Sequence, residues 1–230
     1  MSPEIRERAF EDAIECGLLA HGPDACADAA GVVREVPPPF GETPPGGYLR
    51  RTFADYDPIL CLLPRDAVDF VLGTQPKEWQ KLAQHHGAQV KEQFLKRLAA
   101  EIERRGVLDV LRHGVKDSGC RFSLAYFRPA SGLNQETRRL HAANLFSVVR
   151  QLCYRPSAPG TKDGPALDLC LFLNGLPIFT AELKNPFNGQ DVEDAIRQYQ
   201  KDRDPRDPLL AHGRCLAHFA VDPDLVYVTT

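Results

Sequence analysis

Apolar residues recur every three to four positions in five segments of the chain, a spacing that places them on one face of a helix. The segments are residues 4–20, Asp66–Leu72, Trp79–Arg105, Asn134–Arg150 and Asp191–Lys201. Asn134 suits the N-cap of the fourth helix, and Gly106 ends the third. Residues 148–154 fit a strand as well as the end of a helix, so both structures stay open there.

Short apolar runs bounded by turn residues predict strands. They lie at Val107–Leu111, Phe122–Phe127, Ala166–Lys184 (two strands around an Asn-Gly turn), Cys215–Val221 and Leu225–Thr229. Residues 22–57 are instead rich in proline and glycine, which predicts an irregular excursion. The order of the elements in the second half of the chain predicts an α/β or α+β fold, with a central mixed β-sheet flanked by helices.

Composition adds limits to this picture. The chain has 230 residues, 43% of them hydrophobic, which is enough for a single domain over residues 1–230 with a real core. The formal net charge of -3 gives no global basic signature, so any contact with nucleic acid must come from a local patch. The chain ends on a predicted strand, and we therefore expect it to be a piece of a longer protein.

The cysteines and the hydropathy pattern indicate the compartment. The 7 cysteines are odd in number and contain no Cys-x-x-Cys pair, which argues against a disulfide framework and a zinc site. We therefore expect a reduced, cytoplasmic compartment. No apolar run is long enough to span a bilayer, so we expect no membrane contact.

Three charged residues interrupt the apolar hairpin, where a purely structural one would carry apolar side chains. They are Asp168, Glu182 and Lys184. Two carboxylates at the end of a strand pair can hold a hard divalent cation, which prefers oxygen ligands. A lysine two residues after the second carboxylate points to the same face and can orient a water or stabilise a phosphate. This chemistry is that of phosphodiester hydrolysis.

The register of the hairpin tests this interpretation. A regular hairpin closed by Asn174-Gly175 would place Asp168 opposite Ala181, so that the carboxylates of Asp168 and Glu182 would point to opposite faces. A three-residue loop or one bulge restores a shared face, and Pro177 is a plausible place for it because proline cannot donate to the ladder. We therefore predict a one-residue irregularity between the two acids.

The segment from Leu167 to Pro186, continued through Ala195-Ile-Arg-Gln-Tyr to Asp202-Arg203, closely resembles the N-terminal nuclease domain of the R subunit of type I restriction endonucleases. Further resemblance lies in Thr74-Gln75 with Trp79, the run starting at Gly106, Tyr126-Phe127, Asn144, and the run starting at Leu216. The resemblance implies a PD-(D/E)xK restriction-endonuclease-like fold. It also implies that Asp168 and Glu182 are Mg²⁺ ligands and that Lys184 is the catalytic lysine.

Some residues around this core are expected to support it. In relatives of the RecB type a helix after the lysine strand carries Gln-x-x-x-Tyr, whereas here Gln198 is followed directly by Tyr199 and position 202 is Asp. Glu11, on the first helix, is a further candidate Mg²⁺ ligand, with a solvated helix face as the alternative. Arg203 is a candidate for contact with DNA phosphates, as are other basic residues, namely Arg138, Arg139, Lys201 and Arg206, with solvated surface charge as the alternative.

The expected function is that of a Mg²⁺-dependent endonuclease that cuts double-stranded DNA in restriction-modification. The resemblance implies separate specificity and methyltransferase subunits as partners, and ATP-dependent helicase domains C-terminal to residue 230. No Gly-x-x-x-x-Gly-Lys-Ser/Thr loop is present, so we expect these residues not to bind ATP. Two alternatives stay open: a catalytically degenerate module that binds DNA or subunits, and a small-molecule enzyme with Glu182 as general base in a closed apolar pocket.

Overall fold

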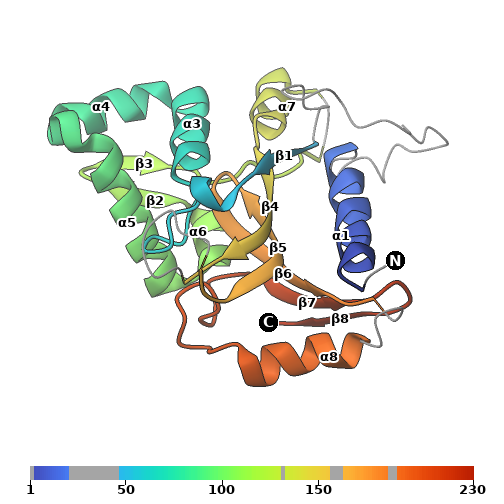
Figure 1. Cartoon of the computed structure of the whole chain (residues 1–230). Coiled ribbons are helices and arrows are strands. Elements are labelled where there is room, and N and C mark those ends of the chain that lie inside the picture. The colour runs from blue at the N-terminus through green and yellow to red at the C-terminus, as the bar shows by residue number, and fades with distance from the viewer. Residues whose placement is uncertain (1–2, 21–46, 131–132, 156–162, 186–190) are drawn as a thin grey trace.

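The computed structural model describes residues 3–20, 47–130, 133–155, 163–185 and 191–230. Its centre is a six-stranded sheet in the order β1-β4-β5-β6-β7-β8 (Figure 1). The strands are β1 (Tyr48–Arg51), β4 (Phe146–Cys153), β5 (Ala166–Leu173), β6 (Leu176–Leu183), β7 (Ala217–Val221) and β8 (Val226–Thr229). Since β1 and β4, and β6 and β7, are parallel and the other neighbours antiparallel, the predicted mixed sheet is confirmed.

Helices flank this sheet, also as predicted. They are α1 (Pro3–Ala20), α3 (Pro64–Thr74), α4 (Pro76–His86), α5 (Val90–Arg105), α6 (Val107–His113), α7 (Gln135–Ala142) and α8 (Val192–Arg197). Shorter turns are η1 (Phe53–Asp55), η2 (Gly87–Gln89) and the π-helical η4 (Gln198–Asp202). A small hairpin of β2 (Val115–Asp117) and β3 (Cys120–Phe122) lies among α3 to α6.

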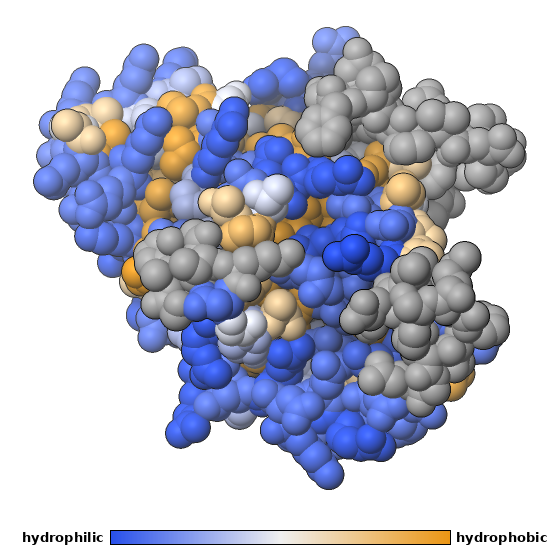
Figure 2. All heavy atoms as spheres, viewed as in Figure 1, coloured by the Kyte–Doolittle hydropathy of each residue, from blue (hydrophilic) through white to orange (hydrophobic). Residues whose placement is uncertain are grey.

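The largest apolar core lies among α3, α4, α5, α6 and the small hairpin, at one end of the sheet. Trp79, Phe94 and Phe122 meet edge to face there, with ring centroids 5.2 to 6.4 Å apart. Edge-to-face pairs add about 0.5–1.5 kcal/mol each to the burial of their surface. This core holds the helices rigidly against the sheet, while hydrophilic side chains cover the outer surfaces of α4, α5 and α8 (Figure 2).

Helix α1 covers a different part of the sheet (Figure 1). Its half-buried Phe10, Ile14 and Leu18 pack against a cluster that includes Val148 and Leu169 of β4 and β5. The i, i+4 spacing of these three residues places them on one stripe of the helix. The predicted amphipathic first helix is confirmed, and its position brings the acidic residues on its neighbouring face to the edge of β4.

Several predicted boundaries are wrong for identifiable reasons. The helix predicted over Trp79–Arg105 is interrupted at Gly87, whose φ of +56° is not helical, and continues as α5 to its predicted end. Val107–Leu111 is the helix α6, not a strand, because a short apolar run fits either period. Of Phe122–Phe127 only Phe122 is in a strand, since the Gln75 side chain pairs with both backbone polar groups of Ser123.

The region around residue 146 resolves an alternative that the sequence left open. Asn134 caps α7 by accepting from the backbone N–H groups of Glu136 and Thr137, as predicted, but the helix ends at Ala142. Residues 146–150 of the predicted helix belong instead to strand β4, which continues to Cys153, so the strand alternative is correct for residues 148–153 and Tyr154 follows directly. Aromatic and β-branched residues favour this strand, and it pairs on both sides inside the sheet.

The excursion predicted at residues 22–57 is only partly within the described residues. Residues 21–46 lie outside them. Tyr48–Arg51 forms a strand of the central sheet, so this part of the prediction is wrong. Arg51 is held there by Asp66, a buried carboxylate that also accepts from Ser147 at 2.5 Å. A neighbouring strand and a buried ion pair thus order a segment whose own composition favours irregular structure.

No helix in the described part of the chain is long and apolar enough to cross a membrane. The six cysteines of the described residues are all free thiols, and five of them are buried. Their distribution agrees with cysteine used as a small apolar side chain of the core.

Candidate active site

The central hairpin contains the irregularity that the two acids require. Its turn, Asn174-Gly175, has φ of +50° and +79°, and Leu173 pairs with Leu176 across it. Farther along, the register shifts, because Phe172 pairs with Pro177 while Leu171 pairs with Phe179. Ile178 is therefore one extra residue on β6, directly after Pro177. The predicted one-residue irregularity is confirmed.

Beyond the bulge the shifted register brings the two acids to the same side of the hairpin. Leu169 pairs with Ala181, and one further step places Asp168 opposite Glu182. Asp168 is fixed at both oxygens: Oδ2 accepts from the Leu183 backbone N–H at 2.7 Å and Oδ1 from the Gln151 side chain at 3.1 Å. A carboxylate with two donors has a defined orientation and still keeps about half of its lone-pair positions.

Glu182 is nearly inaccessible to solvent, with 1% of its surface exposed. Its Oε1 accepts from Nε and Nη2 of Arg203, at 2.8 and 2.5 Å, whereas Oε2 is buried and has no hydrogen-bond partner among the described residues. Burial and the nearby charge of Asp168 raise the pKa of Glu182 to about 8, against the opposing effect of Arg203. A buried carboxylate with an unsatisfied oxygen is costly unless a cation or proton compensates it.

Arg203 reaches Glu182 from the end of the π-helical turn η4. The Arg203 N–H donates to the Gln198 carbonyl five residues earlier, which is the π-helical pattern. Its guanidinium also donates to the Ala166 carbonyl at 2.6 Å and lies over the Tyr154 ring, 5.8 Å from the centroid. The side chain is 10% exposed. Arg203, considered from the sequence as a contact to DNA phosphates, thus pairs with the carboxylate of Glu182 at the side of the site.

Lys184 follows Glu182 by two residues at the end of β6, so its side chain lies on the same side of the sheet. Its backbone N–H donates to the Val221 carbonyl at 2.8 Å, which continues the pairing with β7 past the strand end. Only 7% of the residue is exposed, yet it lines the same pocket as Asp168. This position at a strand end follows from Asn185 and Pro186, which come directly after it in the sequence.

Glu11 lies at the same edge, on α1. Its Oε2 accepts from Arg150, at 2.8 Å from Nη2, and its Oε1 accepts from Gln151 Nε2 at 2.8 Å. Burial raises the pKa of Glu11, the hydrogen bond from Arg150 lowers it, and the charge of Asp168 raises it. The structure therefore brings Glu11 into the electrostatic environment of Asp168, and the solvated helix face considered as an alternative does not describe this side chain, which is 4% exposed.

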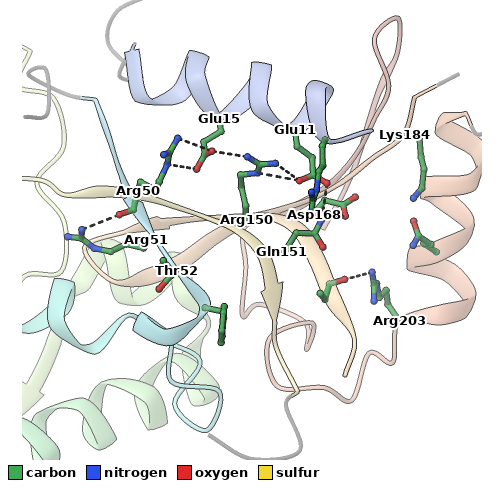
Figure 3. Close-up of a pocket in the computed structure, with 14 residues that line it drawn as sticks. Glu11, Glu15, Arg50, Arg51, Thr52, Arg150, Gln151, Asp168, Lys184 and Arg203 are labelled. Atoms are coloured by element: carbon green, nitrogen blue, oxygen red, sulfur yellow. Dashed lines mark hydrogen bonds and ion pairs between the residues drawn. The ribbon is translucent and has the colours of Figure 1, made fainter. Parts of the chain in front are cut away.

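Two residues of β4 belong to the site and were missed by the sequence reasoning, Arg150 and Gln151. Burial alone would lower the pKa of Arg150, but hydrogen bonds to Glu11, Asp12 and Glu15 outweigh it and raise that pKa. These bonds tie α1 to the sheet (Figure 3). The only sequence signal for them is that two polar residues interrupt the apolar pattern of β4.

The other two predicted residues divide between the site and the core. Gln198 lines the pocket, and its buried Oε1 has no partner in the part of the chain that the structure describes. The hydroxyl of Tyr199 instead shares a hydrogen bond of 2.8 Å with Thr180, which in turn contacts His218 at 2.7 Å. Burial raises the pKa of Tyr199 well above its ordinary value. Tyr199 thus stabilises the sheet beside the site, through a residue two positions from Glu182 along β6.

Apart from Glu182 and Tyr199, these groups line a pocket of about 980 Å³ formed by α1, β1 and the turn after it, β4, β5, the segment after β6, and η4 with Arg203 (Figure 3). Basic side chains outnumber acidic ones in its lining: Arg8, Arg50, Arg51, Arg150, Lys184 and Arg203 against Glu11, Glu15 and Asp168. Glu11 and Glu15 point from α1 toward arginines of β1 and β4. Lys184 and Arg203 lie at the other end of the pocket, beyond Asp168 as seen from Arg50 and Arg51. Most of the side chains that line this pocket are charged or polar, so it is not the closed apolar pocket expected for a small-molecule enzyme.

Among the described residues, no group of three His, Cys, Asp or Glu side chains is arranged to hold a metal ion. The pair Asp168 and Glu182 stays the predicted donor set for a cation. Mg²⁺ is commonly bound by one or two carboxylates and keeps several waters, so a pair is sufficient. A bound cation would give Oε2 of Glu182 a partner and would favour the ionised form of this carboxyl, whose pKa is raised here. Both features therefore fit a cation site.

A mixed six-stranded sheet flanked by helices, with paired carboxylates and a lysine at the rim of its central hairpin, is consistent with a PD-(D/E)xK-like nuclease fold. The family model described as type I restriction enzyme R protein N terminus matches residues 71–230, and the chain belongs to this family. Comparisons with curated proteins and with solved structures gave no match. The resemblance stated from the sequence is confirmed, while the roles of the individual site residues stay predictions.

Proposed function

We propose that this chain is the endonuclease domain of a type I restriction enzyme R subunit and hydrolyses phosphodiester bonds of double-stranded DNA with Mg²⁺. The observation that carries the proposal is the bulge at Ile178, which brings Asp168 and Glu182 to the same side of the hairpin, with Lys184 beside them. Bulges of this kind recur next to active sites, where they redirect a side chain. Membership of the family supports the DNA substrate and the restriction-modification setting.

In this proposal Asp168 and Glu182 would hold the cation. When bound, Mg²⁺ supplies positive charge to the scissile phosphate and lowers the pKa of water. The chain contributes the orientation of the ligands: the Leu183 N–H and Gln151 hold Asp168, and Arg203 holds Oε1 of Glu182, which leaves the lone pairs of the buried Oε2 unused by the described residues. Preorganised groups of this kind need no rearrangement at the moment of reaction.

Lys184 is the group that we assign to the attacking water and the phosphate. The reaction forms a bond between the water oxygen and phosphorus and breaks the bond between phosphorus and the leaving oxygen, while the attacking water gives one proton to the solvent and the leaving oxygen takes one from it. Lys184, at a strand end and 7% exposed, would orient this water and balance the negative charge that develops on the phosphate. A buried position strengthens both effects because little water screens the charge.

The rest of the restriction enzyme has the roles that the family suggests. We expect specificity and methyltransferase subunits to select the DNA, and helicase domains C-terminal to residue 230 to use ATP. No residue of this chain is assigned to ATP in the proposal. The arginines along β1 and β4 would contact the phosphate backbone around the cut, where positive charge supports binding without sequence preference.

The test uses the assembled restriction enzyme with its full-length R subunit. Asp168→Ala, Glu182→Ala and Lys184→Ala should each lower the rate of DNA cleavage by at least about a hundredfold, the usual effect of losing one preorganised catalytic group. ATP-driven translocation, measured on the same preparations, should be unchanged. Glu92→Ala and Lys96→Ala are matched controls, since these two residues form an exposed pair on α5.

Cleavage at the wild-type rate by the three site variants, with translocation intact, would show that the domain is a degenerate module that binds DNA or subunits. Loss of both activities together would instead indicate a failure of folding or assembly. Melting curves of the variant chains distinguish this outcome, because a folded variant keeps a cooperative transition near that of the controls.

A further inference from the structure

Gln151 connects Glu11 to Asp168. Its Nε2 donates one hydrogen to Glu11 Oε1 at 2.8 Å and the other to Asp168 Oδ1 at 3.1 Å (Figure 3). A side-chain amide nitrogen carries two donors, so a single group satisfies both carboxylates. The three side chains come from three elements, β4, α1 and β5, and Gln151 is 140 and 17 residues from its two partners along the chain.

The backbone of Gln151 is unusual, and this explains how it reaches both acids. Regular strand geometry sends successive side chains to opposite faces, yet Arg150 and Gln151 both donate to Glu11. Gln151 has φ of +47°, a left-handed conformation that is uncommon and strained for a residue other than glycine. Such strain persists where the surroundings enforce it, and here it turns one side chain toward the site.

The lone pairs of the three carboxylates are used unequally. Glu11 accepts three hydrogen bonds from Arg150 and Gln151. Asp168 accepts one on each oxygen, and Glu182 accepts on Oε1 while its Oε2 has no partner within the described ranges. A carboxylate offers roughly four lone-pair positions, so Glu11 has the fewest left for a cation.

We infer that Gln151 is a positioning residue that orients Asp168, and that Glu11 supports the site by holding Gln151 and Arg150, not as a ligand of the cation. The inference rests on the proposed function, because it concerns how the pair Asp168 and Glu182 binds Mg²⁺. Groups that orient a ligand typically contribute about ten- to a hundredfold to metal affinity.

The test measures Mg²⁺ binding to the chain by calorimetry, together with its melting temperature. Gln151→Gly is the informative variant, because glycine adopts the left-handed conformation without strain and only the side chain is lost. We expect the dissociation constant for Mg²⁺ to rise about tenfold, and the melting temperature to stay within a few degrees. Gln84→Ala, at an exposed position of α4, is the control and should change neither quantity.

A double-mutant cycle separates support from ligation. If Glu11 acts through Gln151, Glu11→Gln should weaken Mg²⁺ binding in the wild-type chain and have little further effect in the Gln151→Gly background. If Glu11 is a ligand, its loss should weaken binding by the same factor in both backgrounds. Equal factors, or unchanged Mg²⁺ affinity of Gln151→Gly, would overturn the inference.

Failure of the inference and failure of the proposed function give different results. Unchanged Mg²⁺ binding by Asp168→Ala and Glu182→Ala, or no binding by the wild-type chain, contradicts the proposed site itself. Binding that depends on these two acids but not on Gln151 contradicts only the positioning role. In the assembled enzyme, Gln151→Gly should need about tenfold more Mg²⁺ for half-maximal cleavage and regain most of its rate at saturation, as expected for weakened binding.

Discussion

Mg²⁺ binding should release a proton from Glu182, and this coupling gives a quantitative test of the site. Because the pKa of Glu182 is raised to about 8, the free carboxyl is about nine-tenths protonated at pH 7. Ionising it at pH 7 costs about 1.4 kcal/mol, one pKa unit, which the cation must supply. The apparent affinity for Mg²⁺ should therefore rise about tenfold per pH unit below pH 8 and level off above it.

Calorimetry in two buffers with different enthalpies of ionisation measures the proton directly. We expect the chain to release about 0.9 protons per Mg²⁺ at pH 7 and about 0.1 at pH 9. Glu182→Gln should abolish this release, in addition to weakening binding, because the amide has no proton to lose in this range. Glu92→Gln, an exposed substitution on α5, should leave the release unchanged.

Two results would refute the reasoning. Mg²⁺ binding with the same affinity at pH 6 and pH 8 would mean that Glu182 is already ionised in the free protein, so that Arg203 outweighs burial and Asp168. Proton release that persists in Glu182→Gln would assign the titrating group to another residue. Either outcome would leave the fold intact and change only the charge state assigned to the site.

Two further predictions concern stability. The folded pKa of Glu182 lies above its ordinary value of 4.5, so the protonated carboxyl stabilises the fold fully below pH 4.5 and this stabilisation is lost as pH rises through 8. Between pH 5.5 and 8.5 the free energy of unfolding of the wild-type chain should therefore fall by about 3 kcal/mol relative to that of Glu182→Gln. The difference in melting temperature between the two chains measures this loss. Gly175→Ala should cost about 2–3 kcal/mol in denaturant unfolding, because Gly175 has φ of +79° and a Cβ there would meet the Leu63 carbonyl at 2.5 Å; an unchanged midpoint would contradict this.

The hairpin and its bulge could be predicted from the sequence because they depend on local facts. Asn174-Gly175 specifies the turn, and the demand that Asp168 and Glu182 share a face specifies an extra residue near Pro177. The helices with long apolar stripes, α1 and α5, were predictable for the same reason. Short elements such as α6 were not, because a short apolar-rich run fits either period and packing decides between them.

The support of the site could not be read from the sequence. Gln151 acts through a left-handed backbone and through contact with Glu11, 140 residues away, and neither leaves a local pattern. Arg203 was recognised as basic, but its partner Glu182 became visible only with the π-helical turn in place. Long-range partners of buried charges are set by the tertiary structure, and periodicity carries no information about them.

The bulge at Ile178 also explains the number of residues that lie between Asp168 and Glu182. Thirteen residues separate Asp168 from Glu182. In an antiparallel hairpin closed by a two-residue turn, directly opposed residues always enclose an even number of residues, so an odd count cannot be paired without one additional residue in a strand or in the turn. Whether the number of residues between the two acids is odd or even is thus a geometric property of the hairpin. Inserting or deleting a single residue within it would turn one of the two carboxylates to the opposite face and so separate the pair.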